Sequence, residues 1–125
     1  KVEHDKIKHF GFVQPENFVE YIEQTGVYIL PSHVEPWGVS LHEYAAAGFP
    51  LICSNQVGAL EKFIQKGKNG YVFPARDKEA IKEAFRKVID LTENQLLDMQ
   101  KKSIELSLLV TPEKWANTLI KLIND

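Results

Sequence analysis

The stretch Pro31–Pro50, PSHVEPWGVSLHEYAAAGFP, decides how the rest of the chain can be interpreted. It places two glutamates, Glu35 and Glu43, around a Pro-Trp-Gly turn that leads into an alanine-rich helical segment. The first turn of a helix has backbone N–H groups without intrahelical partners, and the helix dipole makes this end attractive to anions. Ionised glutamates are acceptors suited to hydroxyl groups. The stretch therefore predicts a site for a sugar phosphate.

The helix in this stretch is predicted to span residues 37–47, which places the N–H groups of Gly38, Val39 and Ser40 in its first turn. Gly38 has no side chain, so a phosphate or a sugar can approach the backbone closely. The Ser40 hydroxyl adds a donor, and the two glutamates can hold vicinal hydroxyls of a hexose or a ribose. Two isolated glutamates are more often solvated surface carboxylates, and that alternative stays open at this point.

Short apolar segments alternate with segments of helical periodicity along the chain. The expected strands are residues 7–13, 27–30, 51–54 and 71–73, and the expected helices between them are residues 15–24, 37–47 and 58–65. This alternation predicts an α/β fold, a Rossmann-like parallel sheet of about four strands with flanking helices and right-handed crossovers. Ligands of such a sheet bind outside the carboxyl ends of its strands. The segments expected there are residues 11–13, 31–40 and 54–58.

The last third of the chain is predicted to be helical. Asp77 can cap one helix, Thr92 and Gln95 form a capping box for a second, and the Thr-Pro pair at 111–112 opens a third. The apolar side chains expected to face inward are Ile81, Ala84, Phe85 and Val88, then Leu96, Leu97 and Ile104, then Trp115, Leu119, Leu122 and Ile123. Trp115 is interpreted as a packing anchor.

Composition excludes several classes of function. A chain of 125 residues is long enough for one domain but not for two. The net charge of −2 gives no footprint for nucleic acid, and no apolar run is long enough to cross a bilayer. The chain begins with Lys1 and shows no signal peptide, so we expect a fragment of a cytoplasmic protein. The single cysteine, Cys53, favours a reducing compartment, and its apolar surroundings indicate a packed thiol.

Other kinds of site are weakly indicated. The carboxylates of a glycosidase stand about 5–9.5 Å apart, whereas eight residues of helix separate two groups by about 12 Å along the axis. This geometry disfavours hydrolysis by Glu35 and Glu43. The chain has no Asp-x-Asp pair, no His-Glu-x-x-His, no Walker loop and no Gly-x-Gly-x-x-Gly. We therefore predict no metal site and no ATP or dinucleotide site.

Residues 31–54, PSHVEPWGVSLHEYAAAGFPLICS, taken together resemble the donor-site motif of family 4 retaining glycosyltransferases. That motif runs Pro-Ser-x-x-Glu-Pro-[Phe/Trp]-Gly, with a second Glu eight residues after the first, then small residues and Gly-x-Pro. The matching positions are Pro31, Ser32, Glu35, Pro36, Trp37, Gly38, Glu43, Gly48 and Pro50. The resemblance extends from about residue 7 to the C-terminal helix. Because of this resemblance, we now prefer the interpretation of Glu35 and Glu43 as ligand-binding residues to their interpretation as solvated surface carboxylates.

The resemblance implies a role for individual residues. Glu35 is the implied catalytic residue and holds hydroxyls of the donor sugar, while Glu43 binds the ribose. The implied donor-binding set is Phe12, Val13, Glu35, Trp37, Gly38, Val39, Ser40 and Glu43. Backbone around residues 12–13 meets the base, and the amides of residues 38–40 face the sugar and the diphosphate. Such enzymes need no metal and no further cofactor. Lys62 replaces the glutamate of the family's Gly-Gly-x-x-Glu, so no role is transferred there.

The resemblance also implies that residues 1–125 are a single, partial domain, the C-terminal nucleotide-sugar-binding lobe of the two-lobe GT-B fold. Its donor is a UDP- or GDP-sugar. The acceptor, a glycan, lipid or small molecule, is expected to bind through the missing N-terminal lobe, and any attachment to the cytoplasmic membrane face depends on that lobe. The fragment alone is expected to be inactive.

Two alternatives concern the sheet and the function. In a 3-2-1-4-5-6 sheet, two strands absent from this chain would lie between residues 7–11 and residues 27–30. Either these two segments pair directly, or exposed sheet edges recruit another chain and the fragment self-associates. The alternative functions are a noncatalytic nucleotide-binding or interaction module with a flavodoxin-like sheet, and a GT-B nucleotide-sugar epimerase or phosphorylase.

Overall fold

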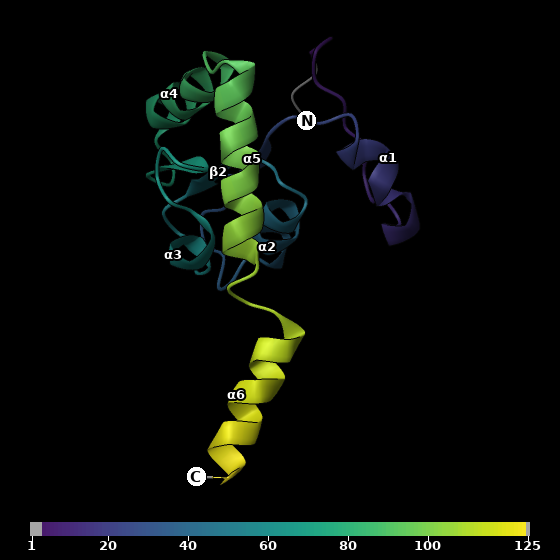
Figure 1. Cartoon of the computed structure of the whole chain (residues 1–125). Coiled ribbons are helices and arrows are strands. Elements are labelled where there is room, and N and C mark those ends of the chain that lie inside the picture. Colours follow the sequence, from purple (N-terminus) through teal and green to yellow (C-terminus); the bar gives the residue numbers. More distant parts are fainter. Residues whose placement is uncertain (1–3, 125) are drawn as a thin grey trace.

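A three-stranded parallel sheet with helices on both faces forms the centre of the computed structural model, which describes residues 4–124 (Figure 1). The strands are β1 (Tyr28–Leu30), β2 (Leu51–Ser54) and β3 (Gly70–Phe73), in the spatial order β1-β2-β3. The helical elements are η1 (Pro15–Asn17), α1 (Phe18–Ile22), α2 (Val39–Ala46), α3 (Leu60–Phe63), α4 (Lys78–Ile89), α5 (Glu93–Ser107) and α6 (Pro112–Asn124).

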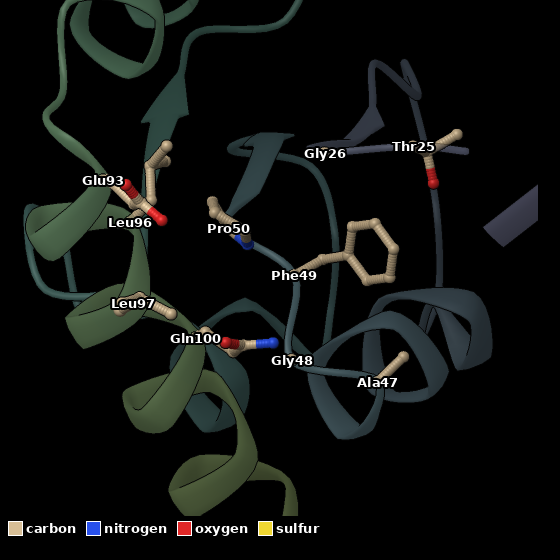
Figure 2. A pocket seen from close by; sticks show the side chains of 10 residues that line it. All are labelled: Thr25, Gly26, Ala47, Gly48, Phe49, Pro50, Glu93, Leu96, Leu97 and Gln100. Carbon is tan, nitrogen blue, oxygen red and sulfur yellow. The ribbon is translucent and has the colours of Figure 1, made fainter. Parts of the chain in front are cut away.

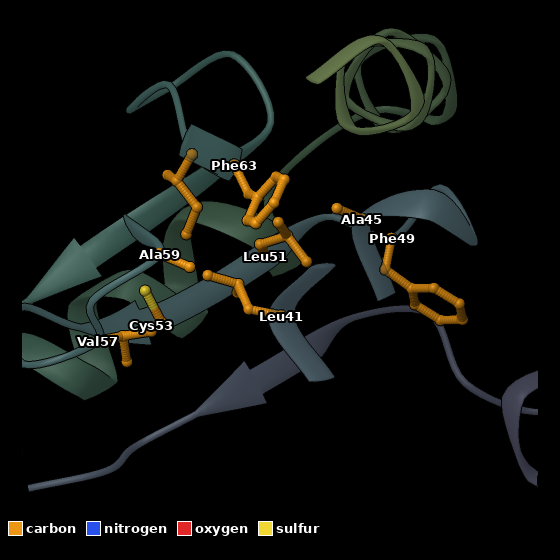
Figure 3. Close-up of a cluster of buried hydrophobic side chains, with 9 residues drawn as sticks. Leu41, Ala45, Phe49, Leu51, Cys53, Val57, Ala59 and Phe63 are labelled. Carbon is orange, nitrogen blue, oxygen red and sulfur yellow. The ribbon is translucent and has the colours of Figure 1, made fainter. Parts of the chain in front are cut away.

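The central strand β2 is buried along its whole length because helices cover both faces of the sheet. Leu51 and Cys53 join a cluster with side chains of α2 and α3, and Figure 3 shows this cluster. Ile52 joins a second cluster, with side chains of α4. Successive side chains of a strand point to opposite faces, so an uninterrupted apolar run fits a strand covered on both sides. The predicted α/β fold is confirmed, including the bounds of β2.

The C-terminal helices begin as the sequence predicts. Asp77 Oδ1 accepts hydrogen bonds from the backbone N–H groups of Glu79 and Ala80, at 3.1 and 2.9 Å. Thr92 and Gln95 form the reciprocal capping box at the start of α5. These side chains satisfy N–H groups that have no intrahelical partner. Short polar residues at helix starts were therefore a reliable local signal.

The inward-facing residues of α4 and α5 were predicted less well. Ala84 and Val88 are buried in α4, but Phe85 is 40% exposed. In α5, Leu97 and Ile104 are 43% and 41% exposed. The residues of α5 that are buried are Met99, Ser103, Leu106 and Ser107. Two of these are serines, which a search for apolar periodicity does not select.

Ser103 is buried because its hydroxyl is fully used. Its Oγ donates to the carbonyl oxygen of Phe49 at 2.6 Å and accepts from Asn69 Nδ2 at 3.1 Å. Asn69 Nδ2 also donates to the carbonyl oxygen of Phe63 at 2.8 Å. Buried polar groups with partners of this kind are tolerated, whereas unpaired ones are costly. The network ties α5 to the end of the Pro31–Pro50 stretch.

Helix α6 projects away from the rest of the molecule (Figure 1) and contributes no buried residue. Trp115 is 69% exposed. Its interpretation as a packing anchor is therefore wrong for the part of the chain that the structure describes, because no segment there covers the apolar side of α6. None of the helices within residues 4–124 combines the length and the hydropathy needed to cross a bilayer.

Residues 7–13 do not form the predicted first strand, so the sheet has three strands instead of about four. Phe10 is 59% exposed and Phe12 is 84% exposed. A strand needs hydrogen-bonded neighbours, and within residues 4–124 no strand lies beside this segment. The direct pairing of residues 7–11 with residues 27–30 is therefore contradicted. Self-association through sheet edges stays a prediction.

Candidate functional site

The loop after β1 is fastened to the loop after β2 at the carboxyl edge of the sheet. The Glu35 N–H donates to the Gln56 carbonyl at 3.0 Å, and the Glu35 carbonyl accepts from the Gly58 N–H at 2.9 Å. The Ala59 N–H donates to the Trp37 carbonyl at 2.8 Å. These bonds fix the backbone of Glu35 on both sides. The half-buried side chain of Glu35 thus projects from a backbone that is fixed by hydrogen bonds. It lies at the carboxyl edge of the sheet, where ligands of a parallel sheet bind.

Two glycines make this contact between the loops possible. A Cβ atom on Gly58 would lie 2.0 Å from the carbonyl oxygen of Pro36, so any side chain there would push the loops apart. Gly38 has a φ of +96°, and a Cβ atom on it would lie 2.9 Å from Val57 Cγ1. The backbone conformation and the packing against Val57 both favour glycine at position 38.

Helix α2 begins at Val39, two residues later than predicted. The left-handed conformation of Gly38 cannot be part of a helix, so Gly38 is the N-cap and Trp37 lies outside. No side chain caps this end of the helix. The first turn therefore contains the N–H groups of Val39 and Ser40 but not that of Gly38. The N–H group of Gly38 lies at the N-cap, directly before this turn.

The two glutamates differ in their surroundings. Glu35 is half-buried in the fastened loop, whereas Glu43 is exposed on α2. Burial raises the pKa of the Tyr28 phenol, its hydrogen bond to Ser40 opposes this shift, and the charges of Tyr44, Glu43 and Glu35 add smaller upward contributions. The stretch thus supplies one carboxylate on the loop before α2 and one on α2 itself.

Two apolar side chains of the predicted set are partly open to solvent. Trp37 is 43% exposed and meets the buried Phe63 ring edge-to-face, with ring centroids 6.4 Å apart. Val39 is 61% exposed at the start of α2. A ligand bound at the start of α2 would therefore be close to the apolar side chains of Trp37 and Val39.

Phe12 and Val13 lie in a different place from the motif loop. With residues 8–11 and parts of α1, they line a hollow of about 880 Å³. Helix α2 contributes one side chain to this hollow, that of Tyr44. Neither Glu35 nor Glu43 belongs to its lining. The structure thus brings residues 12–13 and α2 to a shared hollow, but it does not join them with the glutamates into one site.

A second hollow, of about 240 Å³, lies at the opposite end of the sheet (Figure 2). Gly26, which comes before β1, and Pro50, which comes before β2, line it together with Glu93 and Gln100 of α5. Its position at the amino ends of the strands separates it from the motif loop. We therefore assign it no part in binding the donor.

Two further reactive side chains, those of Cys53 and His42, have packing roles. Burial raises the pKa of the Cys53 thiol to about 12, so the thiol stays protonated at neutral pH, and the prediction of a packed thiol is confirmed. His42 stacks on Phe63 with centroids 4.3 Å apart, and its Nε2 lies 2.9 Å from the Ser107 carbonyl oxygen. Within the described residues, no group of three or more His, Cys, Asp or Glu side chains could hold a metal ion.

Sequence reasoning missed Tyr28 and Tyr44. The Tyr28 hydroxyl donates to Ser40 Oγ at 2.7 Å, and the two tyrosine rings stack at 4.0 Å. Tyr28 lies in the predicted strand of residues 27–30, and the apolar character of that segment indicates no role for its hydroxyl. A tyrosine in a buried strand usually finds a partner for its hydroxyl, and this rule was the available signal, although it does not name the partner.

Comparison with known proteins identifies the family of the chain. The family model for glycosyl transferases group 1 matches residues 3–105. Glycogen synthase of Mycobacterium tuberculosis is 34% identical over 80 residues, which are 64% of this chain and 19% of that protein. The chain thus spans about a fifth of the length of this relative.

Solved structures give the same fold. Sucrose-phosphate synthase from Thermosynechococcus elongatus superposes with a TM-score of 0.81 and 24% identity, covering 96% of this chain and 30% of that one. The pneumococcal O-GlcNAc transferase GtfA, solved in complex with UDP and GlcNAc, superposes with a TM-score of 0.64 and 30% identity. That match covers 83% of this chain and 22% of GtfA.

Proposed function

Because the chain belongs to the glycosyl transferases group 1 family, we propose that it binds a UDP- or GDP-sugar from which a hexosyl group passes to an acceptor hydroxyl with retention. The observation that carries this proposal is the fastened loop, which holds the Glu35 backbone rigidly beside the uncapped start of α2. That arrangement offers amides for a diphosphate next to carboxylates for sugar hydroxyls. The similarity to GtfA, which was solved with UDP and GlcNAc, supports the same choice of ligand.

The proposal gives the residues separate roles. Glu35 holds hydroxyls of the transferred sugar and is the candidate catalytic residue. Glu43 holds the ribose, and the amides of Val39 and Ser40 face the diphosphate. The remaining members of the predicted set are Phe12 and Val13 for the base, and Trp37 and Gly38 at the margin of the sugar.

The acceptor is proposed to bind outside this chain. The chain covers only 19% of the glycogen synthase and 30% of the sucrose-phosphate synthase that it matches. We propose that it is the C-terminal lobe of a two-lobe enzyme and that the other lobe selects a glycan, lipid or small-molecule acceptor. We further propose that transfer needs no metal and takes place in the cytoplasm, the reducing compartment that a lone buried thiol suits.

Titration calorimetry with two conservative variants tests this division of roles. UDP-glucose, UDP-GlcNAc, GDP-mannose, UDP and GDP are titrated into the wild-type protein, Glu35→Gln and Glu43→Gln. Loss of one charge-assisted hydrogen bond weakens binding about tenfold or more. Glu35→Gln should weaken the nucleotide sugar and spare the nucleotide alone, whereas Glu43→Gln should weaken both. Glu61→Gln, at an exposed carboxylate of α3, is the matched control and should change neither.

Two outcomes would contradict the proposal. Equal binding of nucleotides with and without a sugar, unaffected by Glu35→Gln, would instead indicate a noncatalytic nucleotide-binding module. Measurable sugar transfer by the purified 125-residue chain would show that the acceptor site lies within it.

A further inference from the structure

Tyr28 connects the start of the sheet to the start of α2. Its Oη donates to Ser40 Oγ at 2.7 Å, and its ring stacks on that of Tyr44 with centroids 4.0 Å apart and planes 17° apart. Ser40 and Tyr44 are four residues apart on α2 and so lie on one face of the helix. The Tyr44 ring in turn meets Phe49 edge-to-face at 5.2 Å. The phenol is therefore held in place on both its ring and its hydroxyl.

The contact determines what the Ser40 hydroxyl can still do. A serine in a helix often turns its hydroxyl back to a carbonyl of the preceding turn, which removes it as a donor. Here Ser40 Oγ accepts from the phenol, and the described part of the chain gives it no other hydrogen-bond partner. Its own hydrogen thus remains available. The side chain belongs to the turn whose backbone N–H groups lack intrahelical partners.

We propose that Tyr28 is a positioning residue of the donor site: its phenol holds the Ser40 side chain so that the Ser40 hydroxyl donates to a phosphate oxygen of the nucleotide diphosphate. The inference rests on the proposed function, because it places the diphosphate at the start of α2. The Ser40 hydroxyl then adds a third donor to the amides of Val39 and Ser40. Tyr28 itself does not touch the ligand.

The charges around the phenol favour this role. Burial raises the pKa of Tyr28 and outweighs the opposite effect of its hydrogen bond to Ser40, while the carboxylates of Glu43 and Glu35 add smaller upward contributions, so the hydroxyl keeps its proton at neutral pH and remains a donor to Ser40. A neutral donor also avoids a further negative charge near a diphosphate. The phenol thus supports Ser40 without repelling the ligand.

Substitution of Tyr28 by phenylalanine removes the hydroxyl and keeps the ring that stacks on Tyr44. We expect Tyr28→Phe to raise the Kd of UDP, or of GDP if that nucleotide binds, about three- to tenfold, the value of one hydrogen bond. Binding of the nucleoside alone, uridine or guanosine, should not change because it has no phosphate. Tyr71→Phe is the matched control: this tyrosine lies on β3, away from α2, its hydroxyl has no hydrogen bond within residues 4–124, and both affinities should stay at the wild-type value.

A double-mutant cycle separates positioning from a general structural effect. Ser40→Ala should weaken UDP binding at least as much as Tyr28→Phe, and the double variant should be no weaker than Ser40→Ala. Additive effects, or a normal Kd for Tyr28→Phe beside a weakened Ser40→Ala, would overturn the inference. Equal losses for UDP and uridine would do the same, because they indicate a distorted fold.

The failure of this inference can be distinguished from failure of the proposed function. If neither Ser40→Ala nor Tyr28→Phe changes the Kd of UDP while Glu43→Gln still weakens it, the diphosphate lies elsewhere and only the inference fails. If the wild-type protein binds neither UDP nor GDP, the proposed function fails and the inference fails with it.

Discussion

The motif loop, residues 31–38, and the end of the N-terminal segment, residues 11–13, were both predicted at the carboxyl edge of the sheet, but only the loop is held in place. The loop exchanges three backbone hydrogen bonds with residues 56–59, at 2.8 to 3.0 Å. The N-terminal segment pairs with no strand of the described chain, and its Phe12 is 84% exposed. The ring of Phe10 does contact that of Tyr21 edge-to-face, but Tyr21 is close to Phe10 in the sequence and does not belong to the sheet.

The difference depends on where the partners of each segment lie. The motif loop finds its partners some twenty residues later in the same chain, on the loop that follows the neighbouring strand. The N-terminal segment was predicted to be separated from β1 by two strands that this chain does not contain. A segment held by backbone hydrogen bonds can position a catalytic carboxylate within narrow limits. A segment without such bonds can supply contacts to a ligand only after another part of a protein packs over it. Three experiments test this contrast.

The largest effect is expected for Gly58→Ala. The added Cβ atom would lie 2.0 Å from the Pro36 carbonyl oxygen, and its other near neighbours are also backbone atoms, which cannot turn aside as a side chain can. We expect the free energy of unfolding to fall by about 3 kcal/mol, measured by urea denaturation. Gly26→Ala is the control, since a Cβ atom there would meet nothing within 4 Å. Equal stability of the two variants would mean that the loops are not fastened in solution.

The next effect concerns Cys53, which lies in β2 below the fastened loops. Burial raises its pKa to about 12 in the folded protein, whereas the unfolded thiol ionises near pH 8.5. Between these values the folded state keeps a proton that the unfolded state has lost. The contribution of the thiol to stability is therefore complete below about pH 8.5 and decreases as the pH rises toward 12, by up to about 1.4 kcal/mol per pH unit.

Urea denaturation at several pH values between 8 and 11 measures this slope, and Cys53→Ala provides the reference. Other groups titrate in the same range, so the informative quantity is the difference between the two proteins. The stability of the wild-type protein should fall more steeply with pH than that of Cys53→Ala. Parallel curves would show that water reaches β2, and thus that the edge below the loops opens readily.

The sequence predicted the elements that depend on neighbouring residues. The buried strand at residues 51–54, the Asp77 cap and the capping box of Thr92 with Gln95 were confirmed because their signals are local. The errors involve partners distant in sequence. Ser103 was not expected in the core because its partner, the Phe49 carbonyl, lies 54 positions away in the chain. Trp115 was expected to be buried, although nothing in the described chain covers it.

The candidate site was predicted unevenly for the same reason. The positions of Glu35 and of the first turn of α2 follow from the motif, because loop and helix are continuous in sequence. The start of the helix was misplaced by two residues because Gly38 adopts a left-handed conformation, which glycine permits but which the helical periodicity does not indicate. The Tyr28–Ser40 contact joins a strand to a helix and had no signature in the spacing.

The smallest effect is expected for Phe12→Ala. Because this side chain is 84% exposed, its removal should change the free energy of unfolding by less than about 0.5 kcal/mol. Phe63→Ala is the matched substitution in the fastened region, where the ring is fully buried between the motif loop and His42, and it should cost about 3–5 kcal/mol. Urea denaturation of both variants at two protein concentrations gives the comparison.

The concentration dependence separates two explanations of a contrary result. If Phe12→Ala costs more than about 1 kcal/mol, the segment is covered in solution, since an exposed ring cannot contribute that much. Cover by a second copy of the chain would make the loss grow with protein concentration, as mass action requires for a dimer. Cover by the chain itself would leave the loss constant. The first result would establish self-association through the N-terminal segment, and the second would mean that this segment packs more closely than its exposure indicates.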